Sequence, residues 1–110
     1  MTNRLQSEVL DTPQTDLFDF RMNDGSRNFA DLPETVFFDK IREHLAGLDG
    51  AEETGFISDS VTEMWLDFNY SGYRFTINNQ NSNYWFFVDD PKCTDAILQA
   101  VIDHFKTLLN

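Results

Sequence analysis

The feature that most constrains this sequence is a regular alternation of large apolar and polar side chains from Met64 to Ile77. A period of two is typical of a strand with one buried face. The alternation is interrupted once, at Ser71-Gly72, where glycine can supply the positive φ of a two-residue turn. A hairpin with this turn places apolar side chains opposite each other on one face. The expected pairs are Tyr70 with Tyr73, Phe68 with Phe75 and Leu66 with Ile77.

A third strand is predicted from Tyr84 to Val88, after a link at 79–82 that contains no apolar residue. If all four link residues form the loop, the apolar face continues across the new strand. The expected pairs are then Ile77 with Tyr84, Phe75 with Phe86 and Tyr73 with Val88. The three strands together predict an antiparallel meander.

Two more strands are expected on weaker patterns. Residues 17–22 place Phe18, Phe20 and Met22 on one side, which predicts a half-buried strand followed by a turn at 23–26. A short strand is predicted at 54–58, with Phe56 and Ile57 as its apolar anchors.

Two helices complete the expected fold. Asp31 and Pro33 resemble a helix start, so the first helix is predicted from Leu32 to Ala46, with Gly47 after its last turn. The second helix is predicted from Thr94 or Asp95 to the C-terminus, because apolar residues recur there at the helical period. The stripe of the second helix comprises Ile97, Leu98, Val101, Ile102, Phe105, Leu108 and Leu109.

Both apolar stripes need a partner, and the apolar face of the meander provides one. The expected fold class is therefore α+β, an antiparallel β-meander with two helices packed on one face, in the order β-α-β-β-β-β-α. Residues 17–110 are expected to form a single domain. Residues 1–16 are polar and show neither period, which predicts a flexible N-terminal arm.

The charge of the chain limits its partners. With 19 Asp and Glu against 8 Lys and Arg, the net charge is −11, which repels phosphate backbones and anionic membrane surfaces. We therefore expect no nucleic-acid or membrane partner, whereas a basic protein is electrostatically favoured. The alternative is that the charge serves only to keep the protein soluble. One cysteine and no signal-peptide pattern predict a cytoplasmic location.

The face of the meander opposite the helices is the candidate interaction surface, because it combines aromatic rings with hydrogen-bonding groups as interaction hot spots do. An alternative is that the N-terminal strand or arm covers the two indoles, with Arg74 either stacked on them or paired with Asp67 in the adjacent strand, as in an ordinary sheet. The candidate binding residues are Trp65, Asp67, Arg74, Thr76, Asn78, Trp85 and Phe87.

Catalytic and metal-binding patterns are weak in this sequence. His44 and His104 lie on different predicted helices without metal-ligand spacing, so each is expected to be a solvated or helix-end histidine. Cys93 precedes a helix start that would lower its pKa, but no histidine is close in sequence to act as a base. Asp89-Asp90 is better explained as a turn and cap than as a cation site. We therefore expect no enzyme activity, no cofactor and no metal.

The amide-rich segment 78–83 has two interpretations, a polar hairpin turn or a surface that recognises a backbone or a sugar. The blocks 74–80, 84–88 and 90–93 resemble blocks in a family of small uncharacterised bacterial proteins, over roughly residues 56–105. The resemblance implies a bacterial source and a single domain, and it implies no activity.

Two functional hypotheses follow. The first is a non-enzymatic protein-binding domain, an acidic immunity-type inhibitor or adaptor that uses the outer sheet face. The alternative is a small-ligand-binding or chaperone-like domain with a cavity between the sheet and the helices. The oligomeric state stays open.

Overall fold

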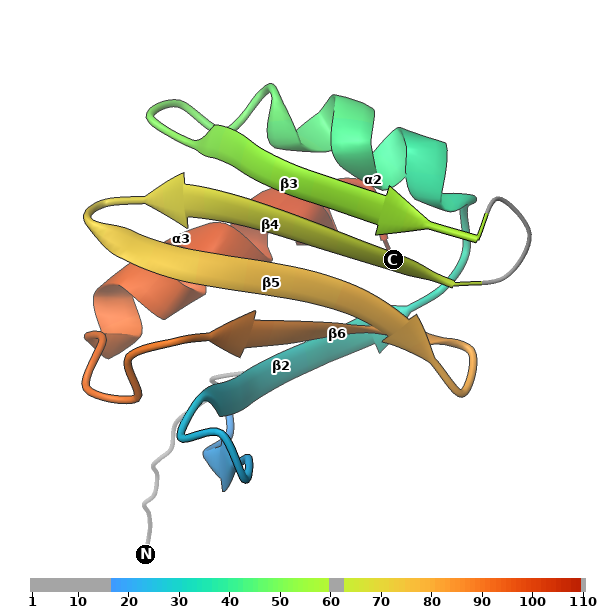
Figure 1. Cartoon of the computed structure of the whole chain (residues 1–110). Coiled ribbons are helices and arrows are strands. Elements are labelled where there is room, and N and C mark those ends of the chain that lie inside the picture. Colours follow the sequence, from blue (N-terminus) through green and yellow to red (C-terminus); the bar gives the residue numbers. More distant parts are fainter. Residues whose placement is uncertain (1–16, 60–62, 110) are drawn as a thin grey trace, which may run out of the picture.

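The chain folds into one antiparallel sheet with helices on one face, as a computed structural model shows for residues 17–59 and 63–109 (Figure 1). The six strands lie in the spatial order β1-β2-β6-β5-β4-β3. The α+β fold and the placing of the helices on one face agree with the sequence-based prediction. The strands are β1 (Phe20–Arg21), β2 (Arg27–Pro33), β3 (Glu52–Ser58), β4 (Met64–Tyr70), β5 (Tyr73–Gln80) and β6 (Asn83–Val88), and the helices are α2 (Phe38–Leu45) and α3 (Asp95–Lys106).

The predicted register of the central hairpin is confirmed. β4 and β5 pair Tyr70 with Tyr73, Phe68 with Phe75 and Leu66 with Ile77. The turn between them has positive φ at both Ser71 (55°) and Gly72 (84°), the geometry that matches the twist of two antiparallel strands.

The predicted register of the next hairpin is wrong by two residues. β5 extends to Gln80 and β6 begins at Asn83, so the turn contains only Asn81 and Ser82, both at positive φ. The pairs are Asn79 with Tyr84, Ile77 with Phe86 and Phe75 with Val88. The tighter turn adds ladder hydrogen bonds at the ends of both strands. A shift of two residues leaves every side chain on its predicted face, whereas a shift of one would have reversed them.

The helix start predicted at Asp31 is also wrong, because residues 27–33 form β2, which pairs with β6. The strand buries Phe29, Ala30 and Leu32, and this long-range pairing overrides the local cap signal. Pro33 is its last residue, a position that a strand tolerates. Helix α2 therefore begins only after Phe37, which has no side chain able to cap it.

The first strand is shorter and more exposed than predicted. β1 contains two residues and pairs only with β2, so it lies at the sheet edge. Phe20 is 63% exposed and Phe18 38% exposed, which contradicts their assignment to a buried face. The segment is tethered instead through Arg27, whose guanidinium donates to the carbonyl oxygen of Phe18 at 2.8 and 2.9 Å.

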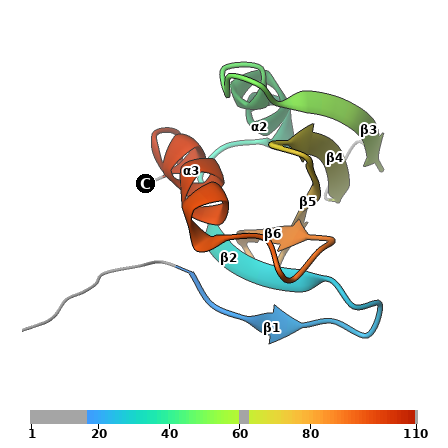
Figure 2. The same ribbon diagram turned by 90° about the vertical axis from the view of Figure 1, so that its left-hand side faces the viewer.

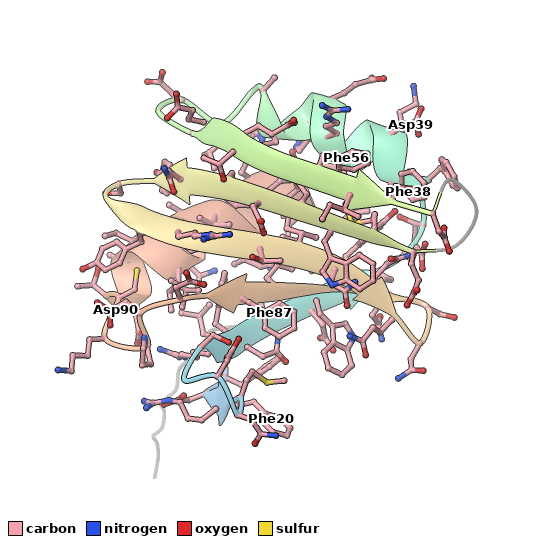
Figure 3. All side chains as sticks on the ribbon, viewed as in Figure 1. Phe20, Phe38, Asp39, Phe56, Phe87 and Asp90 are labelled. Carbon is pink, nitrogen blue, oxygen red and sulfur yellow. The ribbon has the colours of Figure 1, made fainter. Side chains whose placement is uncertain are left out.

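The core lies between the inner face of the sheet and the two helices, which occupy the same side of the curved sheet (Figure 2). Phe86 packs against Phe105 of α3 with ring centroids 5.3 Å apart. On the other side of the core, Phe38 of α2 approaches Phe56 of β3 at 6.1 Å (Figure 3). The fully or almost fully buried core residues include Leu66, Phe68, Phe75, Ile77, Tyr84, Phe86, Leu98, Val101, Ile102 and Phe105.

The two histidines join the C-terminal ends of the helices. The rings of His44 and His104 stack with centroids 4.2 Å apart. Each Nε2 lies next to the other residue's backbone carbonyl oxygen, at 2.8 and 2.6 Å, so each Nε2 donates its hydrogen. These carbonyls belong to helix ends, where each also accepts a backbone hydrogen bond from the residue three positions later, Gly47 at 3.0 Å and Thr107 at 3.3 Å. Both residues are helix-end histidines, one of the two outcomes that the sequence predicted.

Substitutions in the two hairpin turns should change the free energy of unfolding in opposite directions. Ser82 has φ of 66°, which a serine adopts at a cost, so Ser82→Gly should raise the free energy of unfolding by about 0.5–1 kcal/mol. Gly72→Ala should lower it by about 1 kcal/mol, and this loss arises from the backbone alone because an added Cβ meets no atom within 4 Å. Urea denaturation measures both. Equal effects of the two variants would contradict the turn geometry.

Candidate functional site: the outer sheet face

The face of the sheet opposite the helices is called the outer face here, and it is the face turned toward the reader in Figure 1. Strand pairing arranges its side chains in rows that run across the strands. One row contains Ile57, Trp65, Asn78, Trp85 and Asp31. The neighbouring row contains Gly55, Asp67, Thr76, Phe87, Asn28 and Phe20. Six of the seven sequence-predicted candidates belong to these two rows. The seventh, Arg74, pairs with Asn69 in a third row on the same face, so all seven lie on the outer face.

Apolar exposure on the outer face is greatest where β3 meets β4. Trp65 is 40% exposed, and its direct cross-strand partner Ile57 is 68% exposed. Trp85 and Phe87 are half-buried, with ring centroids 6.5 Å apart. Water therefore reaches Trp65 freely, whereas the β6 rings are partly covered.

Trp85 carries an uncompensated polar atom. Its indole Nε1 is buried, and among the residues that the structure describes it has no hydrogen-bond partner. A buried donor without an acceptor costs about 1–3 kcal/mol. The ring therefore stabilises the sheet through its apolar surface and not through its N–H.

Asp67 is the polar centre of the face. It accepts hydrogen bonds from Thr76 Oγ1 at 2.7 Å and from Arg74 Nη2 at 3.1 Å. The pairing of Arg74 with Asp67 confirms one part of the alternative interpretation given above. Arg74 Nε also lies 3.9 Å from Asp89, so two carboxylates flank this exposed guanidinium.

Asn78 has a structural role even though it lies on the outer face. It is only 2% exposed, between Trp65 and Trp85 in the register. Its amide donates to the carbonyl oxygen of Met64 at 2.8 Å, and its Oδ1 accepts from Gln80 at 2.6 Å. Asn78 therefore links β5 to β4 and also bonds Gln80 within its own strand. Because it is almost fully buried, it offers a partner little surface.

A groove of about 230 Å³ lies on the outer face, where the turn between β1 and β2 extends to the side of the sheet away from the helices (Figure 2). In Figure 3, Phe87 lies in front of β6, with Phe20 on the hairpin below it. The lining residues are Met22, Asp24, Ser26, Trp65, Thr76, Asn78, Gln80, Phe87 and Asp89.

Sequence reasoning missed the hairpin side of this groove. Met22, Asp24 and Ser26 could not be placed there, because residues 27–30 were assigned to no element and a helix was predicted to start at Asp31, so no strand was expected to join the turn at 23–26 to the sheet. Ile57 was also missed as a surface residue, although pairing 54–58 with β4 would have placed it beside Trp65.

The charge of the outer face is mainly negative. The negative charges come from four carboxylates, whereas one positive charge comes from the guanidinium of Arg74. The carboxylates are those of Asp24, Asp31, Asp67 and Asp89. Hydrogen bonds from the hydroxyl and the backbone N–H of Ser26 lower the pKa of Asp24 below its ordinary value, which is already well under neutral pH.

The structure gives Cys93 no features of a nucleophile. The thiol is 3% exposed, and burial together with the nearby carboxylate of Asp90 raises its pKa to about 11. In residues 17–59 and 63–109, no three His, Cys, Asp or Glu side chains lie close enough together to hold a metal ion.

The amide-rich segment divides between two roles. Asn79 is buried, accepts from the backbone N–H of Met64 at 2.9 Å and donates to Glu34 at 3.1 Å, so it ties β5 to two neighbouring segments. Asn81 and Ser82 form the turn. A shallow hollow beside them is lined by Glu34, Glu63, Asn79, Gln80, Asn81 and Ser82.

Comparisons with protein families, with curated proteins and with solved structures found no match to this chain. The resemblance to small bacterial proteins therefore stays a prediction. Within the described part of the chain, no helix has both the length and the apolar character needed to cross a bilayer.

The orphan indole donor predicts that Trp85→Phe is tolerated. The phenylalanine ring keeps most of the apolar contact and removes the unpartnered N–H, so the free energy of unfolding should change by less than about 1 kcal/mol. Trp85→Ala, the matched control, should cost about 2–4 kcal/mol because it removes the ring as well. Urea denaturation distinguishes the two, and a loss of more than about 2 kcal/mol in Trp85→Phe would show that the N–H has an acceptor.

The raised pKa of Cys93 predicts that the folded protein loses stability at alkaline pH. The folded thiol keeps its proton to about pH 11, whereas the unfolded thiol ionises near 9.0, so the free energy of unfolding should fall between these values. Burial also raises the pKa of Tyr84, which adds a loss in the same direction at higher pH. Denaturation as a function of pH should show a shallower decline between 9 and 11 for Cys93→Ala than for the wild type. Identical declines would show that the thiol titrates alike in both states.

Proposed function

We propose that this chain is a non-enzymatic protein-binding domain whose outer face contacts a basic protein, in the manner of an immunity-type inhibitor or an adaptor. The observation that carries the proposal is the exposed pair of Trp65 and Ile57 on a face that the chain's own helices do not cover. Large apolar side chains grouped on a surface are typical of interaction sites. Tryptophan in particular contributes strongly to binding because its rigid ring loses little entropy.

Charge indicates the kind of partner. The chain carries a net charge of −11. The outer face is also negative, with Asp24 and Asp89 in the lining of the groove. A negative field accelerates encounter with a positive protein, and apolar contacts then determine how long the complex lasts. A basic protein surface with an apolar centre fits both features.

The alternative, a cavity between the sheet and the helices, is not favoured by a specific observation. The space that it requires holds close-packed side chains, with Phe86 against Phe105 and Phe68 stacked on Phe75 at 5.2 Å. The groove and the hollow beside 79–82 open on the outside of the molecule instead.

The test compares capture of partners from cells of the source organism by wild-type chain and by Trp65→Ala. A captured basic protein is then purified and its affinity measured by titration calorimetry. Trp65→Ala should weaken binding at least about tenfold, and the wild-type affinity should fall as NaCl rises from about 50 mM to about 500 mM.

The matched control is Phe37→Ala, because Phe37 is another exposed aromatic residue, 51% exposed, next to α2. This variant should bind like the wild type. Denaturation curves establish that both variants are folded. A Trp65→Ala variant that folds normally and binds every captured partner with full affinity would overturn the proposal.

A further inference from the structure

The groove on the outer face has an unusual balance of hydrogen-bonding groups, because its hydroxyl protons are already used. Ser26 Oγ donates to Asp24 Oδ1 at 2.6 Å, and Thr76 Oγ1 donates to Asp67 Oδ1 at 2.7 Å. Each hydroxyl oxygen therefore has only lone pairs left for a ligand.

The two carboxamides are partly used. Asn78 Nδ2 donates one hydrogen to the carbonyl oxygen of Met64, and Gln80 Nε2 donates one to Asn78 Oδ1, so each nitrogen keeps one hydrogen while each carbonyl oxygen keeps at least one lone pair. Two carboxylates, which are acceptors when ionised, complete the polar lining, Asp24 on the hairpin turn and Asp89 after β6. The groove thus presents mainly acceptors and two negative charges.

The rest of the lining is apolar or aromatic. Phe87 and Trp65 belong to the sheet, and Met22 lies at the start of the turn between β1 and β2. Aromatic faces attract a cation through the ring quadrupole and also accept its aliphatic stem. A ligand that fits this lining is cationic, rich in donors and partly apolar.

We infer that the groove receives an arginine side chain of the basic partner, an inference that rests on the proposed function. Guanidinium has five donors and no acceptor, remains charged at all physiological pH values, and is flat enough to lie against a ring. The groove volume of about 230 Å³ is below the roughly 300–1,000 Å³ typical of small-molecule sites, which suits one side chain.

Arginine is favoured over lysine by the number and placement of acceptors. Asp24 and Asp89 lie on different segments, with the oxygens of Ser26 and Thr76 also in the lining. A planar fork can donate to several such acceptors at once, whereas an ammonium acts as a point charge. Arg74 hydrogen-bonds Asp67, and its Nε lies 3.9 Å from Asp89 Oδ2, beyond hydrogen-bond distance. Arg74 is not part of the groove lining, so it leaves the groove open to a second guanidinium.

The first test uses the full chain labelled with ¹⁵N and the peptide acetyl-Gly-Gly-Arg-Gly-Gly-amide. Titration should produce saturable shifts of the Trp65 indole N–H signal and of the Gln80 side-chain amide signal. Two peptides with citrulline or lysine in place of arginine serve as controls, and each should bind at least about fivefold more weakly. Equal binding of either control peptide would overturn the inference.

The second test removes the charges of the groove. Asp24→Asn and Asp89→Asn should each weaken the arginine peptide at least about threefold, and the double variant should abolish saturable shifts. Asp103→Asn is the matched control, because Asp103 is an exposed carboxylate on α3 that bonds Gln99. Unchanged peptide affinity in the double variant, with its fold verified by its spectrum, would overturn the inference.

Binding of the captured partner to the Trp65→Ala variant and to the double variant distinguishes failure of this inference from failure of the proposed function. If Trp65→Ala weakens partner binding while the double variant binds the partner and the arginine peptide like the wild type, the proposed function stands and the arginine site is wrong. If the double variant weakens both, the groove is the place where the partner's arginine binds.

Discussion

The rest of the structure depends on the antiparallel pairing of β4, β5 and β6, which places Leu66, Ile77 and Phe86 in one row on the inner face. Because side chains alternate between faces, this same pairing sends Trp65, Asn78 and Trp85 to the other side. Burial against α2 and α3 then fixes the register. The position of both indoles on the outer face is thus a consequence of the way the core is sealed, and the two faces cannot be changed independently.

The outer face combines internal hydrogen bonds with exposed apolar side chains in neighbouring residues. Asn78 and Asp67 are engaged in internal hydrogen bonds, and they hold β4 and β5 in register. Trp65 and Ile57 form an exposed apolar pair beside them. A scaffold of satisfied polar groups under an exposed apolar pair gives a rigid surface, which lowers the entropy lost on binding.

Where local signals and long-range pairing disagreed, long-range pairing determined the structure. Asp31 followed by Pro33 has the chemistry of a helix start, yet residues 27–33 join β6 because the strand buries Phe29 and Leu32. The same competition shortened α2 and left Phe20 exposed on a two-residue edge strand. No local pattern reports which distant strand is available as a partner, so these errors concern topology and not residue type.

By itself, the sequence determined the alternation from Met64 to Ile77, the Ser71-Gly72 turn and the amphipathic stripe of α3, since each depends on neighbours along the chain. It also determined which meander residues share the outer face, because a two-residue error in the β5–β6 loop preserves the alternation. Only the tertiary structure placed β2 between β1 and β6, and the groove exists because that placement brings Asp24 and Ser26 toward Phe87. Contacts between segments about sixty residues apart are decided by burial and strand pairing in three dimensions, which a linear pattern does not encode.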